Sequence, residues 1–481
     1  MFEVHADIAS TLTGNDLQLR FDTGSTVTFL EAEELDDGST LSGIKYNKNG
    51  GSYTFINSAT SADVIVSVVD SQPWTLVNQG NLFVSQSTTP LRSRQLLGGE
   101  LGEPVLRLQF RAQHEAVDVT DIQLTASGST TSNEVDRLEL FKDGEAQPFA
   151  LATIGGCGSD DVLTVNPGAA AAAVKTFCAN MESRQLVVPE GEEVDILVRP
   201  RVKTDTQGAV SGQVVQFFMD NQNVADEATG SGAVRARGDE SSNNLSANDE
   251  DTSGEGEVFI GTDSETTNGY IAGAKNIAVM SKIVSITNAS DDPNGSAIPI
   301  GLSDIGKFKF TGANHTNSKN GNNASILSGI IFNVNATNVA LNASAGNFRV
   351  YNAEDATNTS NCTVYRNDSN RLATTGTASG SLLVDCNGLY AASTVTDINP
   401  GASLTLVLQG NVTDQNSSSV GAPSTLQVSL QDFDSTSRYL YGIENRTYYS
   451  HIEWEDTDTS DTEFRWIEYP TTVVKSTSYA G

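Results

Sequence analysis

The sequence predicts an all-β fold built from tandem β-sandwich repeats, and three observations lead to this prediction. Runs of about four to eight residues alternate apolar and polar side chains and end in turns rich in Gly, Asn, Asp and Ser. The pattern of runs between Val105 and Asp220 returns about 200 residues later. Each copy also contains two cysteines at corresponding places. A repeat of this kind indicates an array of similar domains.

The repeat can be followed strand by strand. Each copy opens with an alternating run, has a middle run before its cysteines, and closes with two runs after them. Strands this short and evenly spaced are typical of an immunoglobulin-like sandwich. The matched runs are Leu106–Phe110 with Lys307–Phe310, Leu138–Asp143 with Phe348–Asn352, Val194–Val202 with Leu404–Val412, and Val214–Asp220 with Leu426–Asp432.

Residues 1–25 resemble only the end of a repeat. Val4–Ile8 resembles the strand that ends at Val202, and Leu17–Asp22 resembles Val215–Asp220. We therefore expect residues 1–25 to be the last two strands of an incomplete sandwich. Because an exposed strand edge can pair with another chain, we expect these strands to complete the sandwich of a neighbouring copy.

Connectors and appended β segments fill the remaining chain. Asn81–Val84 matches Asn276–Val279 as a connector, and an alanine run predicts one short helix over Gly168–Val174. The predicted units are residues 1–25 (two orphan strands), 26–100 (β segment and connector), 101–225 (sandwich with disulfide), 226–300 (appended β segment and connector), 301–435 (sandwich with disulfide) and 436–481 (appended β segment).

The composition excludes some partners. Lys and Arg number 28 against 60 Asp and Glu, which gives a net charge of −32. A surface this negative repels nucleic acid and anionic lipid but suits solubility or divalent cations. No apolar run approaches the roughly 20 residues of a membrane span. Met1-Phe2-Glu3 opens directly into a strand, so we expect an export signal and further domains upstream.

The four cysteines predict two disulfides, Cys157–Cys178 and Cys362–Cys386. Their spacings fit no CxxC metal pattern, and no histidine pairs accompany them. Four buried free thiols are the alternative, but they do not explain why each repeat has two. Because disulfides persist in oxidising compartments, we expect an extracellular, cell-surface protein.

N-glycosylation sequons occur only from Asn244 onward. Some glycans on exposed loops are expected of an exported protein, although a chain rich in Asn, Ser and Thr produces many sequons by chance. The candidate sites are Asn244, Asn288, Asn294, Asn314, Asn323, Asn335, Asn342, Asn358, Asn361, Asn367, Asn411, Asn416 and Asn445.

Two acidic loops are candidate calcium sites. Oxygen-bearing side chains alternate in each loop, and calcium takes six to eight oxygen ligands. Neither loop has the glutamate at position 12 of an EF-hand, and a solvated acidic turn is the alternative interpretation. A solvated turn is the commoner origin of such a pattern, and the matching places of the loops in the two repeats keep calcium as a candidate. The candidate ligands are Asp249, Asp251 and Ser253 in the first loop, and Asp456, Asp458 and Ser460 in the second.

Motifs for catalysis and for ligand binding were weighed against structural roles. Phe21-Asp22-Thr23-Gly24-Ser25 looks like an aspartic-protease motif, but that chemistry needs a second carboxylate, and Asp220 at the matching place ends a strand. No serine triad, Walker motif or dinucleotide motif is present. Arg237-Gly238-Asp239 is a weak adhesion signal. Trp454 and Trp466 could stack on sugar, but covering a small core explains them better.

Four segments resemble large secreted bacterial surface proteins, whose S-layer-like members carry tandem immunoglobulin-like domains. The segments are PEGEEVDILVRPRV (189–202), NPGASLTLVLQGNV (399–412), VHADIASTLTGNDLQLRF (4–21) and IEWEDTDTSDTEFRWIEYP (452–470). The resemblance implies a structural or adhesive surface array, often calcium-dependent, without catalytic residues. The sequon density also leaves an archaeal source open.

The sequence therefore predicts a non-enzymatic extracellular structural protein that assembles with itself into a surface layer or filament. Head-to-tail strand exchange through residues 1–25 does not close on itself and produces such arrays. A cell-surface adhesin or glycan-binding module is the main alternative. A virion surface protein and an aspartic protease acting through Asp22 are more remote.

Overall fold

The computed structural model describes most of the chain from residue 79 onward. Its continuous stretches are residues 79–126, 133–155, 176–181, 184–220, 233–247, 256–261, 269–315, 323–366, 376–389, 396–416, 421–430 and 452–457. Shorter described pieces are the backbone strands β1 (Asp16–Leu17), β2 (Ile44–Asn47), β3 (Thr54–Phe55), β4 (Val64–Ser67) and β5 (Trp74–Thr75) near the start, and β28 (Arg371–Leu372), β34 (Thr462–Phe464) and β35 (Ser476–Ala480) later in the chain.

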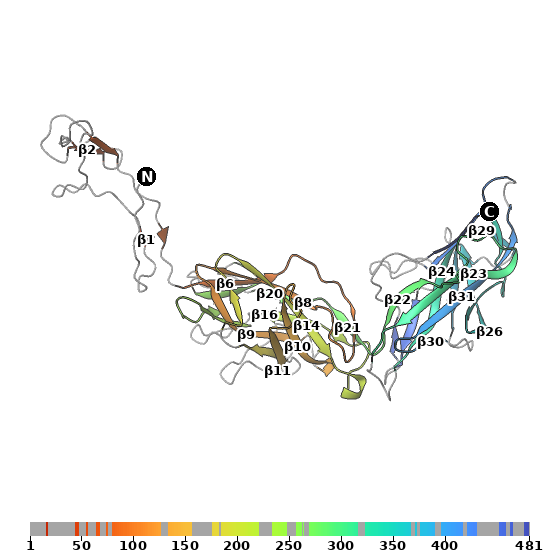
Figure 1. The fold of residues 1–481 in the computed structure, drawn as a ribbon, viewed down its shortest axis with the longest axis horizontal. Helices are drawn as coiled ribbons and strands as arrows, with labels where there is room; N and C mark the ends of the chain where they lie inside the picture. The colour runs from red at the N-terminus through yellow and green to blue at the C-terminus, as the bar shows by residue number, and fades with distance from the viewer. Residues whose placement is uncertain are drawn as a thin grey trace.

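The described chain is almost entirely β-structure, which confirms the all-β sandwich prediction. Figure 1 shows two strand-rich bodies in a row, which we name the first and the second sandwich. The expected helix over Gly168–Val174 lies outside the described residues. The described residues form a short 3-10 turn, η1 (Asp205–Gln207), and Asn133 and Glu134 are also helical. No described helix has the length and hydropathy needed to cross a bilayer.

The first sandwich folds one large sheet over a common core. Hydrogen-bonded strands follow one another as β18-β19-β6-β8-β14-β10-β11-β12-β9-β16-β20, with β13 and β17 also on β9. The strands are β6 (Asn81–Gln86), β8 (Leu106–Gln113), β9 (Val117–Ala126), β10 (Val135–Lys142), β11 (Ala150–Ile154), β12 (Thr176–Asn180), β13 (Leu186–Val188), β14 (Glu193–Val202), β16 (Phe217–Asp220), β17 (Val234–Gly238), β18 (Ser246–Ala247), β19 (Glu257–Ile260) and β20 (Tyr270–Ala272).

The second sandwich is built in the same way around the long strand β24. The main strand order is β22-β23-β31-β24-β29-β27-β28, with further strands on β24, β25, β31, β32 and β33. The strands are β22 (Ile283–Asn288), β23 (Gly301–Gly312), β24 (Ser325–Asn342), β25 (Phe348–Asn352), β26 (Asp355–Asn361), β27 (Thr363–Arg366), β28 (Arg371–Leu372), β29 (Thr377–Asn387), β30 (Asp397–Ile398), β31 (Ser403–Asp414), β32 (Thr425–Leu430), β33 (Ile452–Asp456), β34 (Thr462–Phe464) and β35 (Ser476–Ala480).

Strand registers show that the two sandwiches are equivalent. Phe110 lies opposite Val194 in the first sandwich, and Phe310 lies opposite Leu404 in the second. The matching strand β10 or β25 then pairs with the other edge of β14 or β31. Alternating burial along these strands places one face in the core. The repeat read from the sequence is thus present as matched strand pairs.

Two details of the repeat differ from the sequence-based alignment. Val84 lies opposite Phe110 as Ile286 lies opposite Phe310, so the counterpart of β6 is β22 rather than Asn276–Val279. The strands of the appended segments belong to the sandwiches themselves, because Val234 and Val258 lie in the first core and Trp454 in the second. Asn81–Val84 and Asn276–Val279 share a residue pattern but occupy different places in the sheets.

Candidate functional site: the junction between the two sandwiches

A three-stranded sheet connects the two sandwiches. Its middle strand β21 (Asn276–Val279) pairs with β15 (Val214–Val215) on one side and with β7 (Gln95–Leu97) on the other. Figure 1 shows β21 at the neck between the two bodies. Leu97 and Ile277 pack against the core of the second sandwich, and Val279 is part of that core. The connector is therefore a packed structural element.

Asp456 is the central polar group of this junction. Its side chain is fully buried at the end of β33, and its Oδ2 accepts three hydrogen bonds. The donors are Ser211 Oγ at 2.6 Å, the Met280 backbone N–H at 2.5 Å and the Ser281 backbone N–H at 3.0 Å. Through these hydrogen bonds, the Asp456 carboxylate attaches the second sandwich both to the first sandwich and to the connector.

Further hydrogen bonds surround Asp456. Ser281 Oγ donates to the Ala324 carbonyl at 3.2 Å and lies 2.9 Å from Ser325 Oγ. Lys282 Nζ donates to the Gln95 carbonyl at 2.8 Å across the junction. Hydrogen bonds to a buried charged group are stronger than neutral ones, and an orphaned partner is costly. The junction therefore favours a fixed arrangement of the two sandwiches.

Calcium binding at the two acidic loops stays a prediction. Asp249, Asp251, Ser253, Asp458 and Ser460 lie outside the described residues. Asp456 is described, and its Oδ2 already serves as the hydrogen-bond acceptor of the junction. Within the described part of the chain, no group of three or more acidic, His or Cys residues could hold a metal ion.

The two acidic loops do not occupy equivalent places. Strands β17 and β33 pair with β9 and β24 in the same register, with the same bulge, so Gly238 is the counterpart of Asp456. The loop that follows Asp456 therefore corresponds to the turn after Gly238, not to residues 249–254. This removes the repeat as an argument for calcium at either loop.

One of the two expected disulfides is described in full. Cys362 and Cys386 are bonded, with their Cα atoms 4.3 Å apart, as the sequence predicted. Cys178 is also disulfide-bonded, while Cys157 lies outside the described residues. No described cysteine is free.

The sequons fall into three groups by the exposure of their asparagines. Asn323 is fully buried, so a glycan there is incompatible with the folded chain. Partly buried positions are Asn288, Asn335, Asn342 and Asn411, and exposed ones are Asn244, Asn294, Asn314, Asn358, Asn361 and Asn416. Asn367 and Asn445 lie outside the described residues, and occupancy of the exposed sites stays a prediction.

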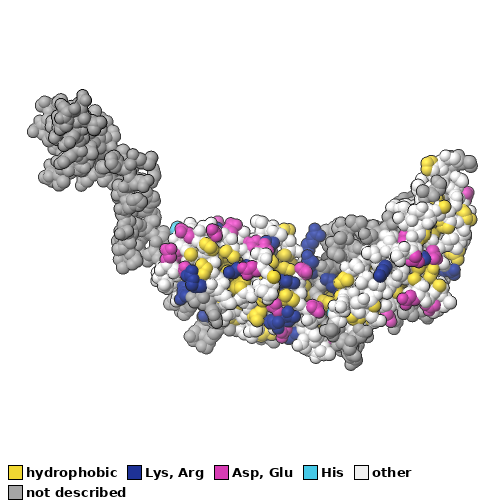
Figure 2. All heavy atoms as spheres, viewed as in Figure 1, with side chains coloured by type: hydrophobic (Ala, Val, Ile, Leu, Met, Phe, Trp, Pro, Cys, Tyr) yellow, Lys and Arg dark blue, Asp and Glu magenta, His cyan; other side chains and the backbone are white. Residues whose placement is uncertain are grey.

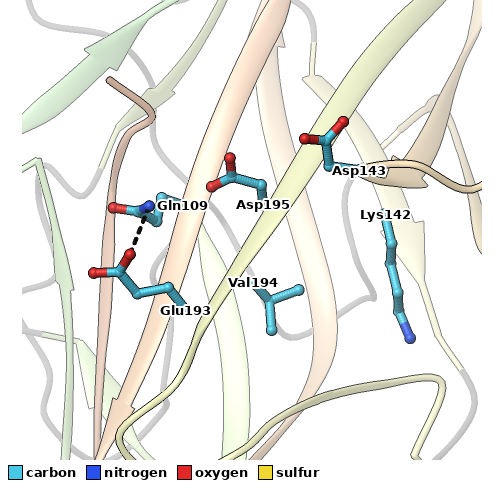
Figure 3. Close-up of a pocket in the computed structure, with 6 residues that line it drawn as sticks. All are labelled: Gln109, Lys142, Asp143, Glu193, Val194 and Asp195. Carbon is cyan, nitrogen blue, oxygen red and sulfur yellow. Dashed lines mark hydrogen bonds between the residues drawn. The ribbon is translucent and has the colours of Figure 1, made fainter. Parts of the chain in front are cut away.

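A shallow hollow of about 400 Å³ lies on the outer face of the first sandwich (Figure 3). Its carboxylates already have partners: Arg107 lies 2.9 Å from Asp195 and 2.5 Å from Asp143, and Gln109 donates to Glu193 at 3.0 Å. The lining contains no histidine, cysteine or hydroxyl side chain that could act as a nucleophile. It consists of Gln109, Lys142, Asp143, Glu193, Val194 and Asp195.

The ligand-binding motifs serve structural roles where they are described. Trp454 is fully buried and stacks on Phe464 with ring centroids 4.7 Å apart, so it belongs to the core. In Arg237-Gly238-Asp239, Arg237 lies 3.1 Å from Asp118 and Asp239 pairs with Arg184. That pairing, through a hydrogen bond to Arg184, lowers the pKa of the Asp239 carboxyl. Trp466 and Asp22 lie outside the described residues.

A second polar cluster connects strands β23 and β25 of the second sandwich. The Tyr351 hydroxyl donates to both carboxylate oxygens of Asp304, each at 3.0 Å. Burial, together with the Asp304 carboxylate, raises the pKa of Tyr351 to about 12. Lys307 lies 2.8 Å from Asp291 and 3.7 Å from Asp304, and its pKa is raised chiefly by the hydrogen bond to Asp291. These contacts link β23 to β25.

Sequence reasoning missed the junction residues Ser211, Met280 and Ser281. Their neighbours in the chain give no signal, because the donors and the acceptor come from segments far apart in sequence. Only the repeat pattern pointed to a connector in this region. Asp456 was singled out, but for a different role.

No protein-family model matches the chain, and no curated protein sequence does. Among solved structures it is similar to the C-terminal domain of the Streptococcus agalactiae AgI/II polypeptide BspA, at 6% identity and a TM-score of 0.18 over 84% of this chain and 100% of that one. The major pilin SpaD of Corynebacterium diphtheriae is matched at 8% identity and 0.20, over 84% of this chain and 66% of the pilin.

The Enterococcus faecalis MSCRAMM ACE, whose structure is described as binding its ligands by a collagen Hug model, is matched at 7% identity and a TM-score of 0.16, over 80% of this chain and 90% of that one. At TM-scores this low these likenesses carry no argument. The fold assignment rests on the strand pairing described above.

Proposed function

We propose that this chain is a non-enzymatic structural protein of the cell surface, whose sandwiches form a stiff rod that assembles into a layer or filament. The observation that supports this most is the buried junction at Asp456. A flexible linker between independent domains does not need a fully buried carboxylate with donors from both sides. A spacer or array subunit does, because it must keep its length and direction.

The surface supports a role in an oxidising, aqueous environment. The Cys362–Cys386 disulfide is the kind of bond that persists outside the cytosol. Figure 2 shows acidic and basic side chains interspersed over the visible face of both sandwiches. The carboxylates that line the hollow on the first sandwich are engaged with Arg107 or Gln109, and its lining has no histidine, cysteine or hydroxyl side chain, so it does not favour a serine or cysteine hydrolase.

Self-assembly through residues 1–25 is part of this proposal. Within the described residues, β1 pairs with β5, and the resemblance of residues 1–25 to the end of a repeat is the observation that supports this step. A strand with an exposed edge pairs with another chain unless that edge is covered. Residues 1–25 would in this way complete the sandwich of a neighbouring copy.

Negative-stain electron microscopy of the purified full chain tests the proposal. We expect regular sheets or filaments as the concentration rises, and we expect them to be lost when residues 1–25 are deleted although the sandwiches stay folded. Collapse on adding a chelator would assign calcium to assembly. Dispersed single rods under all conditions would contradict self-assembly and favour a surface adhesin.

A further inference from the structure

The chain enters the first sandwich against a buried carboxylate. Glu115 is only 7% exposed, and its Oε1 accepts the Gly80 backbone N–H at 2.8 Å. The Ser241 hydroxyl donates to the same oxygen at 2.8 Å. Oε2 accepts the backbone N–H groups of Glu240 at 3.1 Å and Ser241 at 2.9 Å. Glu115 thus ties the entering backbone to the turn after β17.

Gly80 is the counterpart of Ser281 in the junction. Leu82 lies opposite Ala112 in the first sandwich, as Ile283 lies opposite Gly312 in the second. Gly80 precedes Leu82 by two residues, and Ser281 precedes Ile283 by two residues. Both donate their backbone N–H to a buried carboxylate, at 2.8 and 3.0 Å.

The two carboxylates also occupy the same place, although they come from different strands. The strand registers make Gly238 the counterpart of Asp456. A Cβ atom on Gly238 would lie 2.2 Å from Glu115 Oε1, so the Glu115 carboxylate fills the space of a side chain at position 238. The first sandwich has glycine there and takes its carboxylate from Glu115 instead.

The strands before Gly80 repeat the strands before Ser281. Leu17 lies opposite Trp74 and Asp16 opposite Thr75, as Val215 lies opposite Asn276 and Val214 opposite Ile277. The sequence around them agrees: TGNDLQ over residues 13–18 corresponds to SGQVVQ over 211–216, so a hydroxyl residue precedes each strand by the same interval. The strand pair β1–β5 is therefore the counterpart of β15–β21.

We propose that the end of the first sandwich at Glu115 is a second joint of the same construction, and that it seats the strand pair β1–β5 of this chain. Glu115 does there what Asp456 does between the two sandwiches. The joint fixes the direction of the chain before residue 80. It concerns one chain, so it holds whether or not the protein assembles with itself.

Hydrogen exchange of the full-length protein, resolved to single amides, tests the joint without any substitution. We expect the Gly80 and Ser281 amides to be protected to a similar degree, and the amides of Trp74 and Thr75 to be protected with them. A protected Ser281 beside a Gly80 and a Trp74 that exchange at unstructured rates would overturn the proposal.

Paired substitutions then separate the two joints. In Glu115→Ala we expect exchange over residues 74–82 to become at least about tenfold faster, because hydrogen bonds to a charged acceptor are lost, while residues 276–283 stay unchanged. Asp456→Ala should show the reverse, and Glu193→Ala, at a carboxylate in the surface hollow, should change neither. Faster exchange at Gly80 without any change at Trp74 and Thr75 would mean that Glu115 stabilises only the adjacent turn. That result would overturn the proposal that the joint holds the strand pair β1–β5.

Discussion

Several carboxylates of this acidic chain are buried as acceptors for backbone N–H groups. Asp456 does this at the junction between the sandwiches, and Glu115 does it where the chain enters the first sandwich. Asp118 accepts the Arg184 N–H at 2.8 Å, and Glu134 accepts the Val210 N–H at 2.7 Å. A buried carboxylate is tolerated only when its oxygens have such donors. The net charge of −32 therefore overstates how acidic the surface is.

Tyr351 should make the second sandwich sensitive to alkali. Its pKa is raised to about 12 by burial and by Asp304, whereas a tyrosine in the unfolded chain titrates near 10. A group whose pKa is raised on folding contributes stability below the unfolded pKa and loses it as pH rises through the folded pKa. We expect the urea midpoint of the second sandwich to fall between about pH 10 and pH 12.

The variant Tyr351→Phe isolates this effect. It should be less stable at neutral pH, because the hydrogen bonds to Asp304 are lost, but its stability should decline less steeply above pH 10. Some decline should remain, since burial also raises the pKa of Tyr479. An identical decline in the variant and the wild type would show that Tyr351 does not titrate with unfolding.

At the scale of elements, the sequence predicted those strands whose apolar and polar residues alternate. Alternation identified β8, β14, β23 and β31, and the repeat identified their equivalence. Strand β24 was missed although it is 18 residues long, because two stretches of it, 329–332 and 338–341, are buried on both faces and interrupt the alternation. The role of Asp456 was also out of reach, since its three donors lie 175 to 245 residues away in the chain.

The Cys362–Cys386 disulfide should stabilise the β27–β29 pair, where Thr363 lies opposite Asp385. Closing a loop across a separation of 24 residues contributes about 3 kcal/mol in the chain-entropy model. We expect the double variant Cys362→Ala, Cys386→Ala to lower the unfolding free energy of the second sandwich by about that amount. Reducing the wild type should have the same effect on chemical denaturation, and no effect of either would show that the bond is dispensable.

At the scale of the whole molecule, the junction determines whether the two sandwiches act as one body. Asp456→Ala would orphan the buried Ser281 N–H group, at a cost of about 1–3 kcal/mol, whereas the Met280 N–H would keep Ser211 Oγ as its acceptor at 2.9 Å. We expect small-angle X-ray scattering of this variant to show a broader range of maximum dimensions than the wild type. The exposed Asp414→Ala is the matched control. Equal scattering of all three proteins would mean that packing at Leu97 and Ile277 suffices.

The direction in which β22 leaves the junction has a mechanical consequence. Tension that separates the two sandwiches acts on the backbone at Met280 and Ser281, and passes from there along β22, which pairs antiparallel with β23 from Ile283 to Asn288. Force along a strand loads its hydrogen bonds in shear, so they must break together instead of unzipping one by one. A rod connected in this way would extend little until the β22–β23 pair ruptures as a unit.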